Sequence, residues 1–310
     1  MQKILAFFRL IRWFNLLIAG ASLLLFHFFI VVPSLGALTP TLHWWQAVLL
    51  AVSVMCIMAA GNAINDFFDY AQDKKFKPQK QVLGKEISLD EVPYIIGTLN
   101  VVGIGLAAWL AYSVGNLKLV NVFLLSALLL WQYSSTLKKY ALIGNAIVAG
   151  LCAIVFVLPV LFETQLTGSF MLPASKYYIL TQMQGYAVFA FMVTLAREIV
   201  KDIEDAEADK AYNFTTLPVW LGVRVSAVVA GLLEVLLMAA VAFVMYVYWN
   251  NGLKNHFWYA VLFIQFPILV NVIPLFVAYN KTDFRVQSVM LKLTMVFGLV
   301  SIPLFYWFNK

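Results

Sequence analysis

The sequence predicts an all-α, polytopic membrane protein in which about nine transmembrane helices form one bundle. Of the 310 residues, 63% are hydrophobic and 12% are charged, whereas soluble domains are roughly one quarter charged. The mean hydropathy is +0.87. Apolar windows long enough for a helix to cross the bilayer recur along the whole chain. These windows are continuously apolar and do not alternate with a period of two, which favours helices over barrel strands.

The first window follows Lys3, Arg9 and Arg12 and is too long for the apolar core of a signal peptide, so we interpret it as a transmembrane helix. Arg9, Arg12 and Asn15 are interpreted as a topology signal that contacts lipid headgroups, in preference to the alternative of a substrate role. Cys56 and Cys152 lie in apolar windows without metal-type spacing and are expected to pack. The predicted helices cover residues 13–33, 44–65, 92–113, 117–135, 142–162, 177–197, 222–248, 256–279 and 287–308.

Basic residues are distributed unevenly over the connections between these helices. Seventeen of the 21 Lys and Arg residues lie at the N-terminus or around the connections after helices two, four, six and eight. The opposite side carries only Lys118, Lys176, Lys254 and Lys310. The positive-inside rule therefore places the N-terminus and the connections after the even-numbered helices in the cytoplasm. We expect an integral protein of a bacterial or archaeal plasma membrane.

Acidic residues gather in two of these cytoplasmic places. The segments "NAINDFFDYAQDK" (62–74) and "EIVKDIEDAEADK" (198–210) carry aspartates at the same spacing. Positions i, i+3 and i+7 fall within about 60° on a helix, so each trio lines one face. Asn62 and Glu198 join these faces, whereas Glu204 and Glu207 point away and are expected to be solvated. The first trio is Asp66, Asp69 and Asp73, and the second is Asp202, Asp205 and Asp209.

Such trios favour a site for a hard metal ion. Three carboxylates on one face repel one another unless a cation lies among them, and oxygen ligands without His or Cys suit Mg²⁺, or Mn²⁺, better than zinc. Magnesium commonly binds a few carboxylates together with the oxygens of a phosphorylated substrate. A single acidic run at a membrane boundary is usually a solvated helix end, but two runs with one spacing on one side favour a diphosphate site.

The residues resemble a known family at four places. Asn65, Asp66, Asp69 and Asp73 resemble the NDxxDxxxD motif of the UbiA superfamily of intramembrane prenyltransferases. The other three matches are the second aspartate motif around Asp205 and Asp209, "YSSTLKKYALIGN" (133–145) and "TTLPVWLG" (215–222). One departure is "KPQKQVLGKEIS" (77–88), which has lysines where many members carry an Arg-Pro segment, and lysine lacks the bidentate fork of arginine.

The resemblance implies Mg²⁺-dependent transfer of a polyprenyl group from an allylic diphosphate to an acceptor, with release of diphosphate. It implies catalytic roles for Asp66, Asp69, Tyr133, Lys138 and Asp205. The implied metal ligands are Asn65, Asp66, Asp69, Asp73, Asp202, Asp205 and Asp209. The implied diphosphate-binding residues are Asn62, Asn65, Lys77, Lys80, Lys138, Arg197 and Lys201.

The acceptor stays open between two classes at this point. "LIGNAIVAG" and "REIVKDIEDAEADK" are most similar to family members that transfer geranylgeranyl to a glycerol phosphate ether lipid. Members that prenylate an aromatic quinone precursor, 4-hydroxybenzoate or dihydroxynaphthoate, are the alternative. A transporter is the alternative of another class, although transport acids usually lie near the midplane. The expected partners are a polyprenyl diphosphate, the acceptor and membrane lipids, with no nucleic acid.

We expect residues 1–310 to form a single transmembrane prenyltransferase domain with two cytoplasmic segments. Residues 66–91 are expected to be a cap loop that carries the first motif, in which Pro78 and Gly84 prevent a continuous helix. Residues 198–221 are expected to be the loop that carries the second motif.

Overall fold

The computed structural model describes residues 2–166, 173–277, 281–308 and 310, and these residues are mostly helical, with no β-strand among them. Within the described ranges, nine helical segments are long and apolar enough to cross a membrane, which confirms the predicted fold class. They are Trp13–Ser34, Trp44–Phe68, Val92–Ser113, Leu117–Ser135, Ile143–Leu161, Pro173–Ala211, Val223–Asn250, Lys254–Val277 and Phe284–Phe308.

The largest difference from the predicted boundaries is in helix α9, Pro173–Ala211. The sequence predicts a helix over 177–197, because a hydropathy window detects only the apolar part. At 1.5 Å per residue the 39 residues of α9 extend about 58 Å, nearly twice the ~30 Å of a hydrocarbon core. The polar end of α9 therefore continues beyond the membrane as a helix.

Contacts between Cα atoms divide the chain into two compact units. Unit 1 comprises Met1–Leu137 and Val155–Thr181, and unit 2 comprises Lys138–Ile154 and Gln182–Lys310. The boundaries fall inside α8, Ile143–Leu161, and inside α9, so each of these helices contributes to both units.

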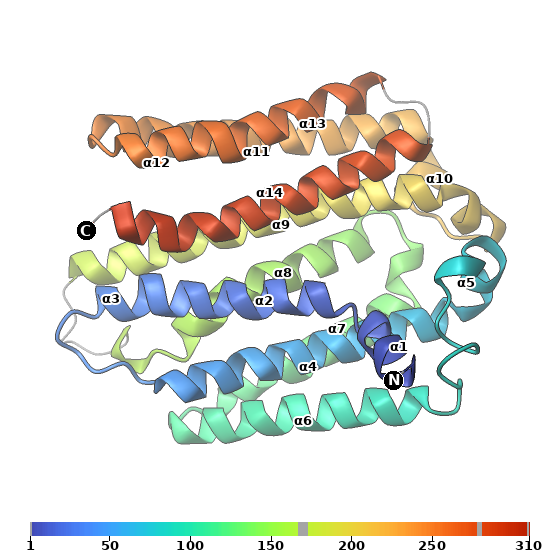
Figure 1. Ribbon diagram of the computed structural model, residues 1–310, viewed down its shortest axis with the longest axis horizontal. Helices are drawn as coiled ribbons and strands as arrows, with labels where there is room; N and C mark the ends of the chain where they lie inside the picture. The colour runs from blue at the N-terminus through green and yellow to red at the C-terminus, as the bar shows by residue number, and fades with distance from the viewer. Residues whose placement is uncertain (1, 167–172, 278–280, 309) are drawn as a thin grey trace. The chain divides into compact units, whose positions relative to one another are not determined.

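Unit 1 is organised around α4, which packs against α2, α6 and α7 and lies between α2 and α6 in Figure 1. Small side chains and glycine line much of the buried surface of α4 and permit close approach of neighbouring helices. A π-helical turn over His27–Val31 joins α2 to α3. Besides parts of α8 and α9, unit 1 contains α1 (Gln2–Leu10), α2 (Trp13–Phe26), α3 (Val32–Ser34), α4 (Trp44–Phe68), α5 (Tyr70–Phe76), α6 (Val92–Ser113) and α7 (Val120–Ser135).

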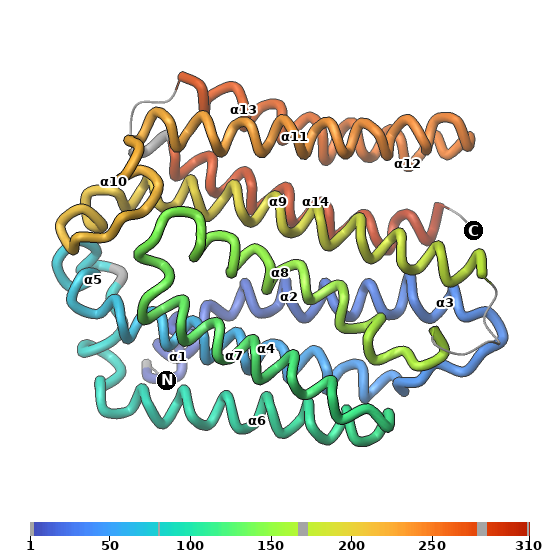
Figure 2. The backbone as a smooth tube through the Cα atoms, turned by 180° about the vertical axis from the view of Figure 1, so that it is seen from behind, coloured from blue at the N-terminus to red at the C-terminus, as the bar shows by residue number. Residues whose placement is uncertain are grey.

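Unit 2 is a bundle in which α11 packs against α13, and α13 against α14, as Figures 1 and 2 both show for the first pair. Its core contains side chains such as Val193, Ala230, Ile268 and Leu291, one from each of four helices. Besides parts of α8 and α9, the unit contains α10 (Leu217–Leu221), α11 (Val223–Asn250), α12 (Lys254–Tyr259), a π-helical segment (Ala260–Gln265), α13 (Phe266–Val277) and α14 (Lys281–Phe308).

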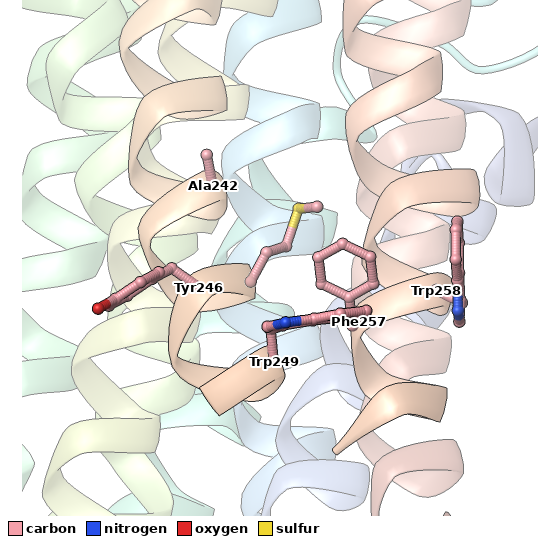
Figure 3. A pocket seen from close by; sticks show the side chains of 6 residues that line it. Ala242, Tyr246, Trp249, Phe257 and Trp258 are labelled. Carbon is pink, nitrogen blue, oxygen red and sulfur yellow. The ribbon is translucent and has the colours of Figure 1, made fainter. Parts of the chain in front are cut away.

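An apolar pocket of about 460 Å³ lies in unit 2 where α11 turns into α12 (Figure 3). The indole of Trp249 and the ring of Phe257 lie 5.0 Å apart at this place. The lining contains no acidic or basic side chain, so this pocket is distinct from the acid motifs. It is lined by Ala242, Met245, Tyr246, Trp249, Phe257 and Trp258.

The contact between α4 and α6 depends on a glycine. A Cβ atom at Gly103 would lie 2.9 Å from Cδ1 of Ile57 and 3.1 Å from Cβ of Cys56. At the same place the Ser53 hydroxyl donates a 2.6 Å hydrogen bond to the Gly103 carbonyl. The two helices therefore have no room for a side chain here.

We expect Gly103→Leu to lower the apparent unfolding temperature in detergent, because overpacking costs about 1–3 kcal/mol. Gly105→Leu on the same helix is the matched control, since a Cβ at Gly105 would meet no atom within 4 Å. An equal effect of the two substitutions would show that the α4–α6 contact is not the cause.

Candidate active site

The first acid motif lies at the end of α4 and in α5. The helix is interrupted at Asp69, where φ is −86° and ψ is 0°. Backbone hydrogen bonds nevertheless continue in i to i+4 steps, from the Asp69 amide to Asn65 O (2.9 Å) and from the Asp73 amide to Asp69 O (2.8 Å). The Lys77 amide donates to Asp73 O at 2.9 Å. Asn65, Asp69, Asp73 and Lys77 therefore follow one another along one face.

Asn65 and Asp69 offer oxygen atoms side by side. Nδ2 of Asn65 donates a 3.0 Å hydrogen bond to Oδ2 of Asp69. Oδ1 of Asn65 is buried and has no hydrogen-bond partner among the described residues. A buried amide oxygen that accepts no hydrogen bond is unusual in a folded protein. A bound cation would supply the missing partner, because an amide oxygen is a suitable metal ligand. The donor set of this motif therefore fits a hard ion such as Mg²⁺.

Asp66 is held by a residue that the sequence does not assign to the site. Nη2 of Arg12 lies 2.7 Å from Oδ1 of Asp66, and the two residues are 54 positions apart. The sequence favours a topology and lipid-headgroup role for Arg12, and this ion pair adds a direct contact with the first motif. No local pattern in the sequence indicates such a distant partner.

The resemblance implies a diphosphate-binding role for Asn62, which shares the face of the aspartates. In the structure its Nδ2 donates a 2.8 Å hydrogen bond to the Ile11 carbonyl. Ile11 precedes Arg12, where the chain breaks between α1 and α2 with a positive φ of 54°. Asn62 therefore connects the first motif to this break.

The segment after the first motif is folded and largely not helical. After α5 come a 3-10 turn, Pro78–Lys80, and a bridge between Leu83 and Ile87. Gly84 adopts a φ of +75°, and a Cβ there would lie 2.7 Å from the Tyr70 hydroxyl oxygen. The expectation that no continuous helix spans Pro78 and Gly84 is therefore confirmed.

The basic residues of this segment differ in exposure and in their contacts. Lys77 is half-buried, whereas Lys74 and Lys75 are exposed. Nζ of Lys85 donates a 2.6 Å hydrogen bond to the Pro78 carbonyl. The side chain of Lys80 lies outside the described residues.

The second acid motif lies on the last turns of α9, which has no break there. Glu198 is buried and forms ion pairs with Arg197 at 3.0 Å and with Lys201 at 2.7 Å. Arg197 and Lys201, both assigned to the diphosphate, thus contact Glu198. Glu207 is exposed as expected, whereas Glu204 is only partly exposed.

Neutral donors hold two aspartates of the second motif. Nδ2 of Asn145, at the start of α8, donates a 2.8 Å hydrogen bond to Oδ2 of Asp202. The Thr216 hydroxyl donates to Oδ2 of the buried Asp209 at 3.1 Å. Asp205 is half-buried. Asn145 and Thr216 lie in the segments 133–145 and 215–222, but their roles were not predicted.

The remaining predicted residues lie between the two motifs in sequence. Tyr133 is half-buried near the end of α7, in unit 1. Lys138 is half-buried on the 3-10 turn Leu137–Lys139 and belongs to unit 2. The backbone of Thr215 donates to the Lys139 carbonyl at 2.7 Å, which connects this turn to the segment after the second motif.

Among the described side chains, no group of three or more His, Cys, Asp or Glu is close enough to hold a metal ion. Magnesium does not require such a group, because it commonly keeps several waters and binds one or two carboxylates together with substrate phosphates. Each motif contributes carboxylate or amide oxygens of this kind.

Comparisons with known proteins agree with this chemistry. The model of the UbiA prenyltransferase family matches residues 23–297. The chain is 33% identical over 245 residues to the digeranylgeranylglyceryl phosphate synthase of Methanoregula boonei, with 79% of this chain and 78% of that relative covered.

Two solved structures share the fold. One is described as digeranylgeranylglyceryl phosphate synthase in membranes, with a TM-score of 0.62 and 23% identity over 97% of this chain and 99% of that one. The other is a UbiA homolog from Archaeoglobus fulgidus bound to GPP and Mg²⁺, with a TM-score of 0.55 and 17% identity over 96% of this chain and 99% of that one. The family match covers most of the sequence, and the chain belongs to the UbiA prenyltransferase family.

Proposed function

We propose that this prenyltransferase transfers a geranylgeranyl group from geranylgeranyl diphosphate to a glycerol phosphate ether lipid that already carries one such chain. The observation that carries the proposal is the repeated aspartate register, which places Asp66, Asp69 and Asp73 and also Asp202, Asp205 and Asp209 at ends of membrane-spanning helices. The identity to the Methanoregula boonei synthase supports the choice of acceptor.

Oxygen donors of both motifs are proposed to hold Mg²⁺. The solved Archaeoglobus fulgidus homolog, which has the same fold, is bound to GPP and Mg²⁺. When bound, Mg²⁺ supplies Lewis acidity that stabilises the leaving diphosphate. The proposed ligands are Asn65, Asp66, Asp69 and Asp73 in the first motif, and Asp202, Asp205 and Asp209 in the second.

The reaction breaks the allylic C–O bond of the donor and forms an ether C–O bond to the acceptor hydroxyl, whose proton is released. Negative charge develops on the diphosphate, and Lys77, Lys138 and Lys201 are proposed to stabilise it, together with Asn62, Lys80 and Arg197. Tyr133 is proposed to hydrogen-bond the diphosphate or to stabilise the carbocation with its ring. The apolar helices exclude water from the cation.

The test is transfer from labelled geranylgeranyl diphosphate by the purified protein, with Mg²⁺ or EDTA. We expect a Mg²⁺-dependent product with geranylgeranylglyceryl phosphate, and a loss of more than about 100-fold in Asp69→Asn because a metal ligand is removed. Glu207→Gln is the control, since this carboxylate is exposed. Product with 4-hydroxybenzoate or dihydroxynaphthoate instead would assign an aromatic acceptor. No diphosphate release with any donor length would contradict the proposal.

The hydroxyl of Thr216 is proposed to orient Asp209. We expect Thr216→Val, which keeps the shape and removes the donor, to weaken the apparent Mg²⁺ affinity by about 10–100-fold, as removal of outer-shell donors does. Thr216→Ser restores the hydroxyl and is expected to stay near wild type. Mg²⁺ titrations of initial rate measure this, and equal affinities of the Val and Ser variants would contradict the role.

The N-terminus and both motifs are proposed to face the cytoplasm, on the basis of the uneven distribution of Lys and Arg. Lys85 and Lys118 are both exposed and lie in connections assigned to opposite sides. In a background without Cys56 and Cys152, we expect a membrane-impermeant maleimide to label Lys118→Cys in intact cells and Lys85→Cys only after lysis. The reverse pattern would invert the topology.

A further inference from the structure

The N-terminal strap, residues 2–12, contacts the first acid motif and the segment that follows it. Its three basic residues each form an ion pair within unit 1: Lys3 with Glu91 at 2.9 Å, Arg9 with Glu86, and Arg12 with Asp66 at 2.7 Å. The Lys3 hydrogen bond also lowers the pKa of Glu91. Only the last of these pairs involves a proposed metal ligand.

Apolar packing fixes the strap in addition to these charges. Ala6 and Leu10 of α1 are completely buried and belong to one core cluster with Val82 and Ile87. The Asn62 amide holds the Ile11 carbonyl from α4. The strap is therefore anchored immediately before Arg12, and its position does not depend on the Arg12–Asp66 pair alone.

Arg12 adopts the left-handed backbone conformation, with φ 54° and ψ 53°. This conformation is unfavourable for a non-glycine residue and occurs where the surrounding structure enforces it, often at functional sites. From this backbone conformation the Arg12 side chain reaches Asp66, and 40% of the side chain is exposed. A guanidinium at this place can contact both a carboxylate and an anion arriving from water.

We propose that Arg12 is a positioning residue that competes with the metal ion for Asp66 and turns to the donor diphosphate when the metal takes its place. The inference rests on the proposed role of Asp66 as a Mg²⁺ ligand. A cation next to Asp66 opposes binding of a second cation, but it attracts a diphosphate. Arg12 therefore weakens binding of metal alone and strengthens binding of the anionic donor.

The test compares these two affinities, since a merely structural role would change both in the same direction. Binding of Mn²⁺ alone is measured by the loss of the free-ion EPR signal, and binding of the unreactive thiolodiphosphate analogue of the donor by calorimetry in the presence of Mg²⁺. We expect Arg12→Gln to bind Mn²⁺ about two- to fivefold more tightly and the analogue about two- to fivefold more weakly, the range for a partly exposed ion pair.

Arg9→Gln is the matched control, because it removes one charge from the same strap at a pair with Glu86. We expect it to leave both affinities within twofold of wild type. Arg12→Lys keeps the charge and is expected to keep the Mn²⁺ affinity. Should Arg12→Gln fail to fold, Arg12→Gly repeats the test at a backbone conformation that glycine accepts.

Asp69→Asn separates failure of this inference from failure of the proposed function. If Asp69→Asn weakens Mn²⁺ binding while Arg12→Gln leaves it unchanged, the metal site stands and the inference is wrong. If Arg12→Gln weakens both ligands, Arg12 is structural and the inference is again wrong. If Asp69→Asn leaves Mn²⁺ binding unchanged, the proposed metal role of the first motif is overturned with it.

Discussion

The two acid motifs depend on how carboxylates are stabilised where membrane-spanning helices end. An uncompensated charge that loses water there is costly, and a cation or a hydrogen-bond donor lowers that cost. The hydrogen bonds and ion pairs of these carboxylates involve partners of two kinds. The cationic contacts are Arg12 with Asp66 and Arg197 and Lys201 with Glu198, and the neutral ones are Asn145 with Asp202 and Thr216 with Asp209.

The backbone presents the two motifs in different ways. In the first motif the helix is interrupted at Asp69 and resumes as α5, and the hydrogen-bond ladder of Asn65, Asp69 and Asp73 bridges the interruption. In the second motif α9 continues to Ala211 without interruption. The same spacing of aspartates therefore occurs on an interrupted helix in the first motif and on a continuous helix in the second.

The sequence predicts most of the architecture because the bilayer fixes the length of a spanning helix, and the nine predicted windows correspond to the nine observed segments. It predicts the shared aspartate faces because helical periodicity is local. It does not predict that Arg12 reaches Asp66 or that Asn145 reaches Asp202, since these partners are 54 and 57 positions apart. Packing, which one sequence does not specify by pattern, brings them together.

The strap also makes part of unit 1 depend on contacts between residues that are distant in sequence. The basic residues of this segment pair with Glu91, Glu86 and Asp66, which are 88, 77 and 54 positions away in the chain. Forming such contacts closes long loops and costs chain entropy, and the burial of Ala6 and Leu10 offsets that cost. The three ion pairs therefore report the tertiary packing of unit 1 and not the formation of any single helix.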